Sequence, residues 1–131
     1  MEKRARILLI DDDPDYVSAT KAILETGPYD IEEAYGGEEG LAKVDNVRPD
    51  LIILDVMMPD IDGYKVCQML KENSRWKSIP VLLLTAVVKN LRSTRYTHEM
   101  GMLTDADDFL DKPVDPSVLL KFVENILSRP K

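Results

Sequence analysis

Cysteine is almost absent from this sequence of 131 residues, which contains only Cys67. A single cysteine excludes an internal disulfide and a zinc site built on several cysteines, and it is compatible with a reducing compartment. No run of about 18 apolar residues occurs, and the basic N-terminus leads only into the short run Ile7–Ile10. We therefore expect no membrane insertion and no secretion signal, and we predict a cytoplasmic location.

Basic residues are fewer than acidic residues. The chain has 17 Lys and Arg against 24 Asp and Glu, which gives a formal net charge of −7. Because phosphate contacts need a basic surface, we expect no direct binding of nucleic acid by this domain. The length and the hydrophobic content of 44% suit one buried core, and no repeat or long linker divides the chain. We predict a single domain over residues 1–131.

Short apolar runs alternate with amphipathic stretches along the whole chain. Strands are predicted at Ile7–Ile10, Asp30–Ala34, Leu51–Leu54, Pro80–Leu84 and Asp107–Leu110. Helices are predicted to begin after Asp13, Gly36, Asp62 and Asp115, with a less clear helix between Val87 and Leu103. The alternation predicts an α/β fold: a five-stranded parallel sheet of order 2-1-3-4-5, flavodoxin-like and doubly wound, with helices on both faces.

The predicted helices carry apolar residues at helical spacing. In the helix after Asp62, we expect Val66, Met69 and Leu70 to face inward. The stripe of the last helix consists of Val118, Leu119, Phe122, Val123, Ile126 and Leu127. Cys67 is expected in or beside the core, and Trp76 in a surface loop.

Polar residues follow the predicted strands at their carboxyl ends. Asp11 and Asp12 follow the first strand, Asp55 the third, Thr85 the fourth and Lys112 the fifth. In an open parallel sheet these ends meet at one edge, where ligands bind near the switch point of the strand order. Three crowded carboxylates repel one another, and a hard divalent cation with oxygen ligands, such as Mg²⁺, relieves that repulsion. The sequence therefore predicts a magnesium site at this edge.

The same edge suits phosphoryl transfer. A carboxylate can attack a phosphoryl group and form an aspartyl phosphate, and the remaining needs are positioning and charge neutralisation. In the predicted strand order Asp55 is flanked by the acidic pair on one side and by Thr85 and Lys112 on the other. We predict that Mg²⁺, Lys112 and the Thr85 hydroxyl each contact a different oxygen of a phosphoryl group on Asp55.

Taken together, these motifs resemble the receiver domain of bacterial two-component response regulators. The matching stretches are Ile7–Asp13, Leu54–Gly63, Leu84–Ala86 and Phe109–Pro113. The resemblance implies that Asp55 is the phosphoacceptor and that Lys112 contacts the phosphoryl group. It also implies that Asp11 and Asp12 organise Mg²⁺ together with Asp55 and the backbone carbonyl of Met57. The phosphodonor would be a histidine kinase or a phosphotransfer protein.

The resemblance further implies a conformational switch. Thr85 and Phe109 would be the switch pair, and the face formed by the fourth helix, fifth strand and last helix would bind an effector domain or a second copy. The Lys112–Pro113 bond is a candidate cis peptide. The chain departs from the family between Thr85 and Lys112, where we expect extra residues around Arg95 to Asp105 that border this face.

Two other functions stay open at this point. The stretch Ile7–Asp13 also fits the strand and Asp-x-Asp motif of haloacid-dehalogenase-like phosphatases, although Pro14 and Asp15 depart from the pattern that usually follows. A receiver-like module that binds partners without phosphorylation would leave the predicted acceptor and metal positions unused. Under the receiver hypothesis the protein is not a metabolic enzyme but a signalling switch that catalyses its own phosphoryl transfer and slow dephosphorylation.

Overall fold

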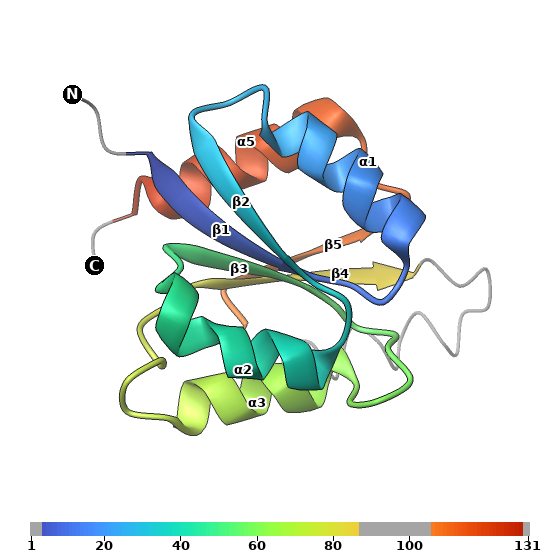
Figure 1. The fold of residues 1–131 in the computed structure, drawn as a ribbon. Coiled ribbons are helices and arrows are strands. Elements are labelled where there is room, and N and C mark those ends of the chain that lie inside the picture. Colours follow the sequence, from blue (N-terminus) through green and yellow to red (C-terminus); the bar gives the residue numbers. More distant parts are fainter. Residues whose placement is uncertain (1–3, 87–105, 130–131) are drawn as a thin grey trace.

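The computed structural model describes residues 4–86 and 106–129 and contains one parallel sheet (Figure 1). Its strands are β1 (Ala5–Ile10), β2 (Tyr29–Ala34), β3 (Leu51–Asp55), β4 (Val81–Ala86) and β5 (Asp108–Lys112). They are hydrogen-bonded in the order β2-β1-β3-β4-β5, and each neighbouring pair is parallel. The predicted fold class and strand order are confirmed.

Helices cover both faces of the sheet. They are α1 (Pro14–Leu24), α2 (Gly37–Val47), α3 (Gly63–Glu72) and α5 (Pro116–Leu127). Figure 1 shows α1 and α5 on one face and α2 and α3 on the other. None of the helices within the described ranges is long and apolar enough to cross a membrane. The helix predicted between Val87 and Leu103, and the extra residues predicted around Arg95 to Asp105, lie outside the described residues.

Aspartate side chains start three of the helices. The side chain of Asp13 accepts hydrogen bonds from the first backbone N–H groups of α1, Asp62 does so for α3, and Asp115 for α5. Pro14 and Pro116 stand in the first turns of their helices, where a missing N–H costs nothing. These predicted caps are confirmed, and each holds a short loop at the carboxyl edge of the sheet.

The central strands are buried on both faces. The runs Ile7–Ile10, Leu51–Leu54 and Val81–Leu84 are 0% exposed. Alternate residues pack into two separate clusters, one beneath α2 and α3 and the other beneath α1 and α5. This burial explains why the sequence shows continuous apolar runs rather than alternation, and it makes the sheet a rigid base for the loops at its edge.

Two predicted core positions are wrong. Met69 on α3 is 39% exposed and Val118 on α5 is 40% exposed. Each is adjacent to a buried leucine, Leu70 or Leu119, and successive residues on a helix point about 100° apart. The buried faces of α3 and α5 are therefore narrower than the apolar residues in their sequences indicate.

Cys67 and Trp76 show how the α3 region is packed. Cys67 is 0% exposed, as predicted. The prediction of a surface loop is only half right for Trp76: it lies in the turn after α3, but its ring packs against the core. Its indole N–H donates to the Asp45 carboxylate at 2.7 Å. An aromatic side chain with one polar atom can close the end of a core in this way.

Gly63 allows α3 to begin close to the end of β3. Its N–H donates to the Val56 carbonyl at 2.8 Å, and a Cβ added here would lie 2.3 Å from the Asp55 carbonyl oxygen. That oxygen belongs to the backbone and cannot rotate away. We expect Gly63→Ala to lower the free energy of unfolding by about 3 kcal/mol, measured by urea denaturation.

Gly27→Ala is the matched control for this prediction. The atoms nearest to a Cβ at Gly27 all belong to the Tyr29 side chain, which can shift. We expect a loss of about 1 kcal/mol or less. Equal stability of Gly63→Ala and the wild type would show that the β3 to α3 connection tolerates a side chain.

Candidate functional site

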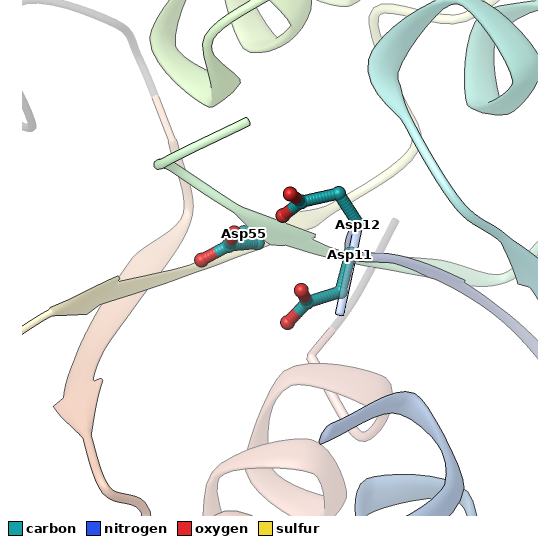
Figure 2. Close-up of side chains that lie close together, drawn as sticks. All are labelled: Asp11, Asp12 and Asp55. Atoms are coloured by element: carbon teal, nitrogen blue, oxygen red, sulfur yellow. The ribbon is translucent and has the colours of Figure 1, made fainter. Parts of the chain in front are cut away.

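Three carboxylates meet at the carboxyl ends of β1 and β3. Asp11 and Asp12 follow β1 directly, and Asp55 is the last residue of β3. One oxygen of each side chain lies within 4.8 Å of the other two, and Figure 2 shows them side by side. Asp11 is 1% and Asp55 3% exposed, whereas Asp12 is half-buried. The prediction that the strand ends bring these acids together is confirmed.

Strand register explains this proximity. Ile10 of β1 pairs with Leu54 of β3, so the next residues, Asp11 and Asp55, come to adjacent positions at the sheet edge. The Asp11 N–H donates to the Ala34 carbonyl of β2 at 3.0 Å, which continues the sheet by one residue. The acids are thus placed by the backbone and not by flexible side chains.

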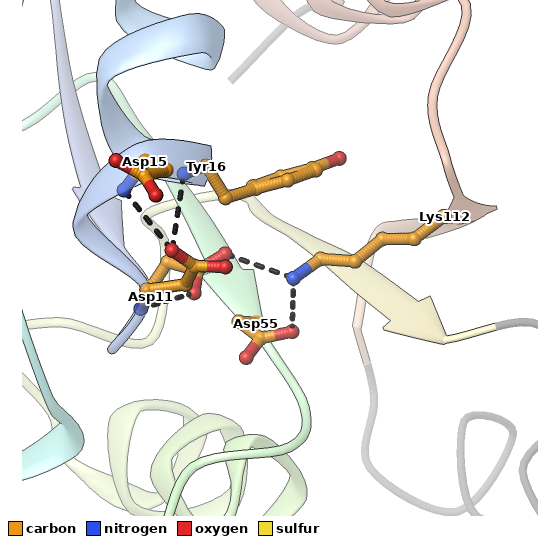
Figure 3. Close-up of polar contacts among 6 residues, drawn as sticks. Asp11, Asp15, Tyr16, Asp55 and Lys112 are labelled. Carbon is orange, nitrogen blue, oxygen red and sulfur yellow. Dashed lines mark hydrogen bonds and ion pairs between the residues drawn. The ribbon is translucent and has the colours of Figure 1, made fainter.

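Lys112 reaches the same cluster from the far side of β4. Its Nζ lies 2.9 Å from Asp11 Oδ2 and 2.8 Å from Asp55 Oδ1 (Figure 3). Its side chain is 19% exposed, and the peptide bond to Pro113 is cis. The structure therefore joins a lysine to the predicted acids, and the cis bond implied by the resemblance is present.

Tyr16 is a member of the site that the sequence did not reveal. Its ring centroid lies 4.0 Å from Lys112 Nζ, and Figure 3 shows the ring beside the lysine chain. An ammonium over an aromatic ring is attracted by the ring's negative face. The one available signal was that Tyr16 stands in the first turn of the helix after the acidic pair, which alone does not indicate a contact with β5.

The site carries more negative than positive charge. Burial raises the pKa of Asp55, and the neighbouring Asp11 and Asp12 raise it further, although the Lys112 hydrogen bond lowers it. Burial lowers the pKa of Lys112, but its hydrogen bonds to Asp55 and Asp11 outweigh this, so its pKa lies above the ordinary value. Three carboxylates against one ammonium leave two negative charges uncompensated when all are ionised. Oxygen donors with this charge fit Mg²⁺.

Thr85 has a different partner in this structure. It ends β4 at 2% exposure, and its hydroxyl donates to the Asp111 carboxylate at 3.1 Å. The register pairs these two residues on adjacent strands. Side chains alternate along β5, so Asp111 and Lys112 extend to opposite faces of the sheet. The Thr85–Asp111 bond escaped sequence reasoning because it depends on strand register.

Two predicted residues remain: Phe109 on β5 and Met57 in the loop after β3. Phe109 on β5 is half-buried and packs against the core beneath α2 and α3. Met57 lies two residues after Asp55, and its side chain is 69% exposed. The switch role of Phe109 and the ligand role of the Met57 carbonyl stay predictions.

Comparison with known proteins places this site in a family. The model of the response regulator receiver domain matches residues 7–124. The DNA-binding dual master transcriptional regulator RpaA of Synechocystis sp. is 40% identical over 124 residues, which are 95% of this chain and 49% of RpaA. The alkaline phosphatase synthesis transcriptional regulatory protein PhoP of Bacillus subtilis is 36% identical, again over 95% of this chain and 49% of PhoP. This chain spans about half the length of these curated relatives.

Solved structures agree with this likeness. The signal receiver domain of a signal transduction histidine kinase from Syntrophus aciditrophicus has a TM-score of 0.82 and 36% identity, covering 97% of this chain and 95% of that one. The chemotaxis response regulator CheY4 of Vibrio cholerae has a TM-score of 0.83 and 29% identity, covering 95% of this chain and 99% of that one. Fold and sequence thus point to the same group of proteins.

These results argue against the phosphatase class that the sequence left open. The receiver model spans nearly all of the chain, including the stretch Ile7–Asp13 that also suited haloacid-dehalogenase-like phosphatases. Receiver domains are signalling switches and not metabolic enzymes. With the strand order, the acidic cluster and the lysine in agreement, the chain belongs to the response regulator receiver domain family.

Proposed function

We propose that Asp55 accepts a phosphoryl group from a histidine kinase or a phosphotransfer protein, and that this transfer operates the receiver as a switch. The observation that carries the proposal is the contact of 2.8 Å between Asp55 Oδ1 and Lys112 Nζ within the cluster of carboxylates. A carboxylate beside an ammonium supports this proposal, because the carboxylate can attack a phosphoryl group and the ammonium can then move to a phosphoryl oxygen.

The transfer requires little covalent chemistry from other side chains. An oxygen of Asp55 attacks phosphorus, the bond from phosphorus to the donor imidazole nitrogen breaks, and the imidazole keeps the electron pair. Lys112 moves from the Asp55 carboxylate to a phosphoryl oxygen. The Thr85 hydroxyl contacts another phosphoryl oxygen once it leaves Asp111.

Four protein groups would hold Mg²⁺ in this proposal: the side chains of Asp11, Asp12 and Asp55 and the backbone carbonyl of Met57. Bound there, Mg²⁺ supplies charge neutralisation at the phosphoryl oxygens. Asp12 is half-buried, whereas Asp11 and Asp55 are buried, so an ion held by Asp12 can keep several of its waters. The uncompensated charge of the site supports this assignment.

The proposal extends to the signalling output. The predicted output face contains β5 and α5, and it would bind an effector domain or a second copy after Thr85 and Phe109 change position. Val118 on α5 is 40% exposed and could supply an apolar contact to a partner. Because the curated relatives are about twice as long as this chain, the single domain over residues 1–131 stays a proposal. The cytoplasmic location is likewise a proposal.

Acetyl phosphate labelling tests the proposed function. Incubation with acetyl phosphate and Mg²⁺ is expected to add one phosphoryl group per chain, observed by intact-protein mass spectrometry and released by hydroxylamine. Chelation of Mg²⁺ by EDTA should slow labelling by about tenfold or more, because the charge on the phosphoryl oxygens is then less well neutralised. Failure of both acetyl phosphate and phosphoramidate to label the protein would favour a binding module that works without phosphorylation.

A further inference from the structure

The Thr85 hydroxyl forms its hydrogen bond on the face of the sheet opposite to the Lys112 side chain. Thr85 is 2% exposed, and its Oγ1 lies 3.1 Å from Asp111 Oδ1. The two residues are register partners on parallel strands that are both hydrogen-bonded into the sheet. The bond therefore joins two fixed backbones.

One hydroxyl cannot serve two acceptors with its single proton. A threonine hydroxyl has one O–H donor, and χ1 of a β-branched residue is confined to a few staggered positions. The Asp111 carboxylate and a phosphoryl oxygen on Asp55 would therefore compete for the same proton. Asp111 lies at the exposed end of β5, so its carboxylate can return to water when the threonine leaves.

We propose that Asp111 is a positioning residue that holds the Thr85 hydroxyl in the unphosphorylated state and so opposes the switch. This inference rests on the proposed function. It makes Asp111 the partner of the Thr85 hydroxyl before phosphorylation, and phosphorylation of Asp55 then draws that hydroxyl away. Losing Asp111 lowers the cost of moving Thr85, and the phosphorylated state becomes more populated.

Beryllium fluoride binding measures this effect. With saturating Mg²⁺, beryllium fluoride can occupy an aspartate as a phosphoryl mimic, and fluorine NMR reports the bound fraction. We expect Asp111→Ala to bind it about fivefold more tightly than the wild type, because a hydrogen bond to a charged acceptor no longer has to be broken. Asp111→Asn keeps an acceptor without the charge, and it should bind about twofold more tightly.

A double-mutant cycle separates the hydrogen bond from the charge. In a Thr85→Val background there is no hydroxyl to release, so adding Asp111→Ala should change the affinity by less than about twofold. Asp108→Asn removes a charge from the same strand without touching Thr85, and it should bind beryllium fluoride as the wild type does.

The outcomes distinguish this inference from the proposed function. A gain from Asp111→Ala that persists in the Thr85→Val background would mean that Asp111 acts by charge alone, which overturns the inference. Unchanged or weaker binding by Asp111→Ala, with normal wild-type binding, would overturn it while leaving the proposed function intact. Absence of binding to the wild type would overturn both.

Discussion

Asp55→Asn is expected to abolish phosphorylation by acetyl phosphate. The amide keeps the shape of the aspartate, but its oxygen is a poor nucleophile and cannot form an aspartyl phosphate. Labelling should fall by about a hundredfold or more, below detection in a time course by intact-protein mass spectrometry. The result depends on Asp55 being the attacking carboxylate among three that lie within 4.8 Å of one another.

Asp62→Asn provides the matched control. Asp62 caps α3 in the loop that follows Asp55, and asparagine is as good a cap as aspartate. This variant should be labelled at the wild-type rate. Equal labelling of Asp55→Asn and the wild type would assign the phosphoryl group to another residue, and peptide mapping would then be directed at Asp11 and Asp12.

Lys112→Met is expected to show the second large effect, on labelling and on stability together. Methionine keeps most of the length of the side chain but leaves Asp11 and Asp55, 1% and 3% exposed, without their shared cation. Removing one partner of a buried pair costs about 3 kcal/mol of unfolding free energy, measured by urea denaturation. Loss of a cation at the phosphoryl oxygens should slow labelling by about a hundredfold.

Mg²⁺ and a second lysine variant provide the controls for Lys112. Mg²⁺ should stabilise Lys112→Met more than the wild type, because the ammonium no longer competes with the ion for Asp11 and Asp55. Lys71 forms an ion pair with Asp107 at 3.0 Å, away from the acidic cluster. Lys71→Met should lower stability but leave the labelling rate unchanged. Wild-type labelling of Lys112→Met would remove the lysine from the proposed mechanism.

The sequence by itself determined the sheet and most of the acidic site. Continuous apolar runs such as Ile7–Ile10 identify strands buried on both faces, because such strands have no solvent side to require alternation. Asp13 and Asp62 mark helix starts through hydrogen bonds made within three residues. Once the strand order is inferred, Asp11 and Asp55 at the strand ends must meet, since parallel strands share one carboxyl edge.

Only the tertiary structure decided which side chains touch across the fold. Lys112 bonds to Asp11 across 101 positions of sequence, and its contact with Tyr16 depends on how α1 is rotated over the sheet. The Thr85–Asp111 bond depends on the register of β4 and β5. The exposure of Val118 depends on how α5 is rotated against the sheet. Sequence patterns within one segment indicate periodicity and helix capping, because both depend on residues only a few positions apart. Register and helix rotation are decided by packing among distant segments, so no single segment contains them.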